Sequence, residues 1–168
     1  NAISLPMWRT LSDALARFEV APAVRCLVLT SRGDKAFCVG ADINEWAALQ
    51  PLDMWRRWVR RGHQVFDQWA QLRQPVVVAI NGHALAGGAE FVLATDIRVM
   101  SSQATIGVTE VRRGLIAGGG SLVRLARQVV QLGQRLHNGL TPQRRQAVMQ
   151  CGGGVVGFDG FGSHQQHV

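Results

Sequence analysis

Two glutamates in glycine-rich segments are the residues of this sequence whose types and spacing best suit chemistry. Glu90 stands in the segment GHALAGGAEF, two residues after the pair Gly87 and Gly88 and among apolar or small residues. A buried carboxylate is costly unless something pairs with it or uses it. Glu110 stands in TIGVTEVRRGLIAGGG, a second loop that leads through glycines toward a helical run. Two such carboxylates can share a water, one accepting a proton while the other donates one, if their environments separate their pKa values.

Both features also have an ordinary structural explanation. Gly87 and Gly88 suit a tight turn or close packing of the chain equally well. Glu110 has Arg112 and Arg113 nearby in the sequence and could form an ion pair with either on the surface. From the residues alone, both explanations stay open.

A second glycine loop, CVGADI, supplies further backbone donors. Gly40 and Ala41 place backbone N–H groups on a strand-to-helix loop, close in sequence to Lys35, the only lysine of the chain. Oxyanion holes generally use two converging N–H groups. This loop and the glycine turn before Glu90 are therefore candidates to hold one oxyanion between them.

Several other chemistries are not expected. The first strand is not followed by GxGxxG, and the chain has no GK[ST] segment, so neither common nucleotide-binding pattern is present. His63 and His83 lack a serine or cysteine in a nucleophile-elbow setting. No set of His, Cys and Asp has metal-ligand spacing. We expect neither a hydrolase triad nor a metal site.

The pattern of apolar residues predicts alternating strands and helices. Ser4 and Pro6 fit the start of a first helix, and tryptophans and other apolar residues return at helical spacing in a later, longer one, where core packing is their usual role. Such alternation favours an α/β fold with parallel strands. The predicted helices cover 5–18, 54–72 and 89–94, and the predicted strands cover 25–31 (buried), 75–81 (buried), 96–101 and 104–108.

Composition indicates one globular domain. The chain has 168 residues, of which 47% are hydrophobic and 17% charged. The net charge of +7 raises the question of nucleic acid, and four arginines cluster in the predicted long helix: Arg56, Arg57, Arg60 and Arg61. Such a cluster is usually a solvated helix face. Nucleic acid is not our expected partner.

Cysteine usage and hydropathy bear on the compartment. Cys26, Cys38 and Cys151 contain no CxxC pair, so we expect no disulfide framework and a reducing compartment, the cytoplasm. No apolar run approaches the eighteen or so residues of a membrane span, and the first residues lack a signal-peptide pattern. We expect no membrane association.

Taken together, three segments resemble the crotonase superfamily, the enoyl-CoA hydratases and isomerases. Their order and spacing make the joint match specific, and the similarity spans residues 1–129, including NAIS at the start. The resemblance implies a spiral of ββα units with mainly parallel sheets. The matching segments are KAFCVGADINEW, QPVVVAINGHALAGGAEFVLATDIRV and ATIGVTEVRRGLIAGGGSLVRLARQV.

The resemblance also implies roles for individual residues. The oxyanion hole for a thioester carbonyl matches the backbone N–H groups of Ala41 and Gly87, and the two catalytic glutamates of hydratases match Glu90 and Glu110. Both being present favours hydration of a trans-2-enoyl-CoA, with Glu90 activating water and Glu110 delivering a proton to the α-carbon. Coenzyme A is then part of the substrate, no separate cofactor is implied, and the substrate would contact Lys35, Ala36, Ala41, Asp42, Ile43, Asn44 and Gly87.

The similarity ends after Val129. Residues 130–168 are rich in Gln and Gly, and we predict a poorly ordered tail, separate from a catalytic core at residues 1–129. Nothing there resembles the helical region with which family members close the acyl pocket and build a trimer or hexamer, so this region is missing or degenerate, and a shifted reading frame is one explanation. Rival functions are an enoyl-CoA isomerase, a carnitinyl-CoA-type dehydratase, an RNA-binding family member or an inactive fragment.

Overall fold

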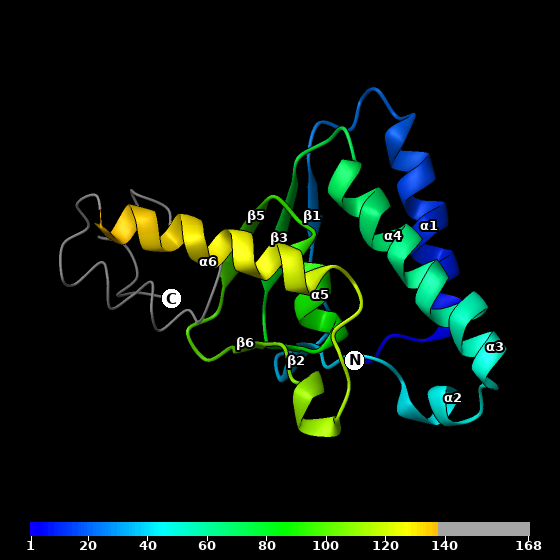
Figure 1. Cartoon of the computed structure of the whole chain (residues 1–168). Helices are drawn as coiled ribbons and strands as arrows, with labels where there is room; N and C mark the ends of the chain where they lie inside the picture. The colour runs from blue at the N-terminus through cyan, green and yellow to red at the C-terminus, as the bar shows by residue number, and fades with distance from the viewer. Residues whose placement is uncertain (138–168) are drawn as a thin grey trace.

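The structure, a computed structural model, describes residues 1–137 as two parallel three-stranded sheets with helices around them (Figure 1). The first sheet has the strand order β1-β3-β5, with β1 at Leu27–Leu29, β3 at Val76–Ile80 and β5 at Ile97–Met100. The second sheet has the order β2-β4-β6, with β2 at Ala36–Cys38, β4 at His83–Leu85 and β6 at Ile106–Gly107.

The chain visits the two sheets alternately, which produces the spiral. Each odd-numbered strand joins the first sheet, the next strand joins the second, and a helical segment follows before the pattern repeats. This is the expected succession of ββα units. The helical segments are α1 (Leu5–Glu19), α2 (Ile43–Ala47), α3 (Pro51–Asp53), a π-helix η1 (Met54–Val59), α4 (Arg60–Gln71), α5 (Gly87–Leu93), a 3₁₀ turn η2 (Glu110–Arg113) and α6 (Ser121–His137).

Helices α1 and α4 lie side by side (Figure 1). The side chain of Ser4 caps α1 by accepting a hydrogen bond from the backbone N–H of Met7. The two helices approach closely at Gly62, where an added Cβ would lie 3.2 Å from the Trp8 ring. Ser12 Oγ also donates to the Gln68 side chain across the interface, at 3.0 Å. The absence of a side chain at Gly62 thus leaves space for the Trp8 ring.

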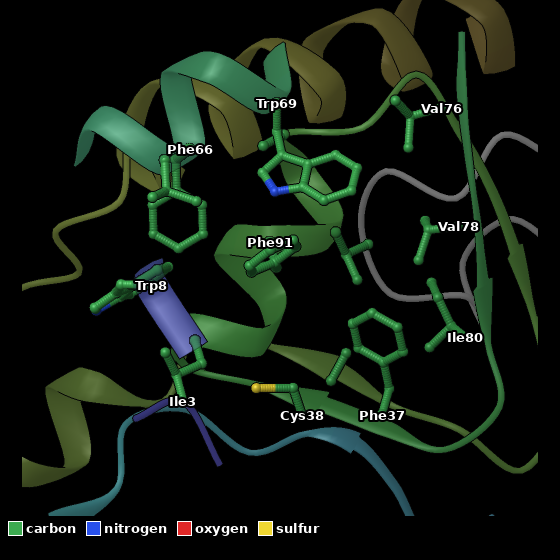
Figure 2. Close-up of a cluster of buried hydrophobic side chains, with 14 of the residues drawn as sticks. Ile3, Trp8, Phe37, Cys38, Phe66, Trp69, Val76, Val78, Ile80 and Phe91 are labelled. Carbon is green, nitrogen blue, oxygen red and sulfur yellow. The ribbon is translucent and has the colours of Figure 1, made fainter. Parts of the chain in front are cut away.

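The core lies between the first sheet and these helices (Figure 2). Along β3, Val76, Val78 and Ile80 are buried and alternate with half-buried residues, as a strand with one face on a core requires. Each such side chain contributes about 1.5–3 kcal/mol when fully buried. Phe91 of α5 lies between two aromatic rings of α4 and makes edge-to-face contacts with Phe66 and Trp69. This packing fixes α5 relative to α4.

The expected helices and parallel strands are present, with three corrections. Strands β2 and β4 fall in segments that we described only as a loop and a turn. The strand at 25–31 is shorter than expected, and it is not buried, because β1 is an edge strand and Val28 is 71% exposed. The helix at 54–72 forms, but its first part is the π-helix η1.

The boundary that we predicted at Val129 falls inside α6, which continues to His137. The division into a core and a tail stays a prediction, because most of the proposed tail lies outside the described residues. No helix within residues 1–137 has the length and apolar character needed to cross a membrane.

Gly88 provides a test of how closely α5 packs on β2. A Cβ at this position would lie 2.0 Å from the backbone carbonyl oxygen of Cys38, so one of the two elements must move. We expect Gly88→Ala to lower the free energy of unfolding by about 2 kcal/mol or more, because overpacking costs about 1–3 kcal/mol and backbone cannot shift as easily as a side chain. Urea denaturation measures the change.

The matched control is Gly107→Ala. Its added Cβ would make only an ordinary contact, 3.4 Å from the Leu85 side chain. We expect its effect on the unfolding midpoint to be much smaller. Equal losses in the two variants would contradict the close packing at Gly88.

Candidate active site

The candidate residues follow the three strands of the second sheet. Gly40 and Ala41 come after β2, Gly87 and Glu90 come after β4, and Glu110 comes after β6. The strands are parallel and hydrogen-bonded in that order, so their carboxyl ends meet at one edge of the sheet. This is the edge at which open parallel sheets bind ligands. The topology therefore brings together segments that are far apart in the sequence.

Glu90 is buried, at 6% exposure, in the middle of these segments. Its Oε1 atom accepts a hydrogen bond from the backbone N–H of Gly119 at 2.5 Å and another from Ser121 Oγ at 3.0 Å. Burial raises the pKa of Glu90 above the ordinary glutamate value, and the two hydrogen bonds act in the opposite direction. Among nearby charges, Glu110 raises this pKa and His63 lowers it. Glu110 is thus close enough for its charge to act on Glu90.

Glu110 begins the 3₁₀ turn η2 and is only partly buried as a residue. Its Oε2 atom is nevertheless buried and has no hydrogen-bond partner among the described residues. Among residues 1–137 Glu110 forms no ion pair with Arg112 or Arg113, so the surface pair that its sequence neighbours allowed is not present there. A buried acceptor without a partner suits a site that receives a ligand.

The two glycine loops lie against each other. A Cβ on Gly40 would come within 2.9 Å of the Ala86 Cβ and 3.4 Å of the Gly87 nitrogen. Gly40 adopts φ of +101°, which strongly favours glycine, and Ala86 is a non-glycine residue with φ of +50°. In the described residues neither Ala41 nor Gly87 donates a loop or cap hydrogen bond through its backbone N–H. Gly40, the residue before Ala41, therefore lies against Gly87, while the binding of one oxyanion by the amides of Ala41 and Gly87 stays a prediction.

The first residues of the chain hydrogen-bond to the CVGADI loop. Ile3 donates to the carbonyl of Gly40 and accepts from the N–H of Asp42, at 2.7 Å in each case. The Ile3 side chain is buried beside Gly87, 3.1 Å from where a Cβ would stand. The NAIS segment thus braces both loops.

Apart from Gly87, the residues matched to coenzyme A binding lie next to or on β2 and in the loop and helix that follow it. Lys35 is exposed, Ala36 begins β2, and Ile43 and Asn44 are exposed in the first turn of α2. The carboxylate of Asp42 caps this helix, because it accepts from the backbone N–H groups of Asn44 and Glu45. The structure thus gives Asp42 a structural role. Contacts between substrate and the residues matched to coenzyme A binding stay a prediction.

Sequence reasoning missed two residues of the site, Gly119 and Ser121. Both were quoted in the GLIAGGGSLV segment, but neither was assigned a task. Ser121 is the first residue of α6 and is almost fully buried. A serine at the start of a helical run after three glycines predicts a helix cap, and no local signal indicates that its hydroxyl bonds to Glu90 instead.

An open apolar groove borders the site. It has a volume of about 410 Å³ and lies between the segment after β6 and the first turns of α6. Ser121 links it directly to Glu90. Its lining residues are Val108, Ser121, Leu122, Leu125, Ala126 and Val129.

Comparisons with known proteins show which sequences and folds this chain is similar to. A sequence profile of the enoyl-CoA hydratase/isomerase family matches residues 1–140. The Bacillus subtilis protein YngF is 37% identical over 131 residues, and the short-chain-enoyl-CoA hydratase of Clostridium acetobutylicum is 35% identical over 129 residues; each match covers 77% of this chain and 49% of the relative. The crystal structure of an enoyl-CoA hydratase from Bacillus anthracis superposes with a TM-score of 0.73 at 36% identity, covering 76% of this chain and 49% of that one. The chain therefore spans about half the length of these relatives.

The raised pKa of Glu90 predicts a pH-dependent contribution to stability. Below about pH 4.3, the ordinary glutamate pKa, the group is protonated in both the folded and the unfolded chain. As the pH rises from there through the higher folded-state pKa, the unfolded chain ionises more readily, so this contribution to folding is lost. We expect the unfolding free energy of the unmodified chain to fall relative to that of Glu90→Gln over this range, measured by urea denaturation from pH 4.5 upward.

The control for this measurement is Glu19→Gln, which changes an exposed glutamate at the end of α1. Its stability difference from the unmodified chain should lack that downward trend with pH. A Glu90→Gln difference that is constant, or that moves in the opposite direction, would contradict the raised pKa.

Proposed function

The chain belongs to the enoyl-CoA hydratase/isomerase family, and from that premise we propose that it adds water across the 2,3 double bond of a trans-2-enoyl-CoA thioester. The observation that carries this proposal is the pair of carboxylates at one sheet edge, Glu90 with its donors and Glu110 with a buried, unpartnered oxygen. Water addition needs one group to take a proton from water and another to give one to carbon. No cofactor is needed beyond the coenzyme A portion of the substrate.

The proposed reaction begins with the thioester oxygen between the backbone N–H groups of Ala41 and Gly87. Glu90 takes a proton from water as the water oxygen bonds to the β-carbon. The electrons of the double bond move toward the thioester oxygen, where the two amides stabilise the enolate. Glu110 delivers a proton to the α-carbon, which restores the thioester. Transfer of the proton from Glu90 to Glu110 then returns the site to its starting state.

The environment of Glu90 supports its role as the base. A general base works best when its pKa lies near the operating pH, and burial raises the pKa of Glu90 toward that range. Its hydrogen bonds to Gly119 and Ser121 engage Oε1. We propose that the other oxygen, Oε2, faces the water.

The substrate has two further parts to place. We propose that the acyl chain extends along the apolar groove beside Ser121, because its lining is aliphatic. The coenzyme A portion would follow the CVGADI loop, with Lys35 near its phosphates. An isomerase or dehydratase would use the same loops, and a profile of enoyl-CoA and 3-hydroxyacyl-CoA substrates separates these activities.

The first test replaces each carboxylate by an amide of the same shape. We expect Glu90→Gln and Glu110→Gln each to lower kcat for crotonyl-CoA hydration by about 10²–10⁴-fold, the usual contribution of a general acid or base. Binding of the saturated analogue butyryl-CoA, measured by calorimetry, should change little, because neither carboxylate is required to hold the thioester.

Glu19→Gln again serves as the matched control and should retain full activity. Full hydration by either active-site variant would contradict the two-carboxylate mechanism. A folded, unmodified chain that binds butyryl-CoA but hydrates no enoyl-CoA would contradict the proposed function for this chain.

The second test separates the oxyanion amides from general backbone strain. Gly40 and Gly33 both have positive φ, +101° and +86°, but a Cβ at Gly33 would meet nothing within 4 Å, whereas one at Gly40 would press on Ala86. We expect Gly40→Ala to lower kcat by at least about tenfold, because the added Cβ would displace the neighbouring oxyanion amides, and full removal of one such donor costs on the order of 10²–10³-fold. Gly33→Ala should lose thermal stability through backbone strain alone, without this loss of kcat. Equal kcat values in the two variants would contradict a role of Gly40 in positioning the oxyanion amides.

A further inference from the structure

We propose that His63 is a positioning residue for Glu90 and acts on it through the single peptide group that joins Gly118 to Gly119. This inference rests on the proposed function for its consequence in catalysis, but not for its structural content. No role was predicted for His63 from the sequence, and the proposed mechanism does not use it. Hydrogen bonds at the two ends of that peptide connect His63 to Glu90.

The two ends of the peptide bond to different elements. A ring nitrogen of His63, Nε2, hydrogen-bonds to the carbonyl oxygen of Gly118. The N–H of Gly119 belongs to the same peptide group and donates to Glu90 Oε1 at 2.5 Å. Because a carbonyl can only accept, the hydrogen must lie on Nε2. The chain of donation therefore runs from the imidazole through one planar amide to the carboxylate.

Such a chain strengthens its members. Donation to the carbonyl oxygen polarises the amide, which makes its N–H a better donor, and condensed-phase estimates put the gain at about 10–30% per bond. A stronger donor at Gly119 favours the ionised form of Glu90. The effect of His63 on the pKa of Glu90 has the same direction, because its charge lowers that pKa.

One face of α4 is shaped to hold this segment. His63, Phe66 and Asp67 stand at positions i, i+3 and i+4 and so share a face of the helix. A Cβ on Gly119 would lie 2.4 Å from the Phe66 ring and 2.7 Å from Glu90 Oε2, so only glycine fits at this position without movement of its neighbours. His63 is therefore one of several contacts that place the peptide.

Charged groups secure the segment after Gly119 as well. Arg124 of α6 donates through Nη1 to the carbonyl of Gly119 at 2.6 Å and through Nη2 to Asp67 at 3.0 Å. Among the described residues, the titratable and charged groups around the Gly118–Gly119 peptide are His63 and Asp67 from α4, Arg124 from α6, Glu110 from η2 and Glu90 itself from α5. Among the residues that the structure describes, only His63 bonds to the carbonyl of the peptide whose N–H reaches Glu90.

The test follows the titration of Glu90 itself, which needs no turnover. Carboxyl-labelled glutamate gives a simple carbon NMR spectrum, because the chain contains glutamate only at Glu19, Glu45, Glu90 and Glu110. Comparison with Glu90→Gln assigns the Glu90 signal. We expect His63→Ala to move the titration midpoint of Glu90 to higher pH, because both the charge and the polarised donor that favour the carboxylate are removed. His63→Gln should move it less, because its amide can still donate to Gly118.

Kinetics supply a second readout. With crotonyl-CoA, His63→Ala should lower kcat at neutral pH by roughly tenfold, less than the loss of a group that transfers a proton itself. KM should be unchanged, and the acidic limb of the pH–rate profile should move to higher pH, because the base must be ionised. The matched control is His83→Gln, which alters an exposed histidine on β4 and should change neither readout.

The outcomes distinguish this inference from the proposed function. If the unmodified chain does not hydrate crotonyl-CoA, yet the Glu90 midpoint rises in His63→Ala and recovers partly in His63→Gln, the inference stands and the proposed function fails. If the Glu90 midpoint is the same in the unmodified chain and in a folded His63→Ala variant, the inference is overturned, whatever the activity.

Discussion

The buried carboxylate of Glu90 is the constraint on which the rest of the site depends. A carboxylate removed from water must be hydrogen-bonded, or its burial opposes folding by several kcal/mol. The donors that compensate Glu90 lie at Gly119 and Ser121, which precede and begin α6. Helix α6 must therefore start against α5. Arg124 and His63 then fix the same segment to α4. One charge thus determines how three helical elements meet.

The glycines of the site are required for packing as much as for chemistry. At Gly88 a side chain would collide with the backbone of β2, and at Gly119 one would collide with Phe66 and with Glu90. At Gly40 the backbone conformation itself favours glycine. Gly87, in contrast, has a backbone N–H with no loop or cap partner in the described residues. Sequence left two explanations open for this glycine pair, close packing and oxyanion binding. Close packing explains Gly88, while oxyanion binding remains the proposed role of Gly87.

Much of this fold follows from sequence, because helical periodicity and β-branched runs are local signals. The helix capped by Ser4 and the buried strand at Val76–Ile80 are examples. Strands β2 and β4 escaped prediction because three residues are too few to show alternation and both lie next to glycines. The exposure of Val28 depends on which strand occupies the sheet edge, and the bond from Ser121 to Glu90 joins residues on two helices. Both are properties of tertiary structure, so no local pattern contains them.

The two glutamates are held differently, and this difference bears on how they divide the work. Glu90 is braced through Oε1 by donors that favour its ionised form, against burial that favours the neutral one. The pKa of Glu90 is therefore set by these opposing influences before any substrate binds. Glu110 stands on a single 3₁₀ turn, and its buried Oε2 atom has no hydrogen-bond partner in the described residues. In the proposed reaction, the bound substrate or water would supply its hydrogen-bond partner. A base needs a set affinity for its proton, whereas a group that delivers a proton to carbon needs contact with the substrate, so the supporting structure favours Glu90 for the first task and Glu110 for the second.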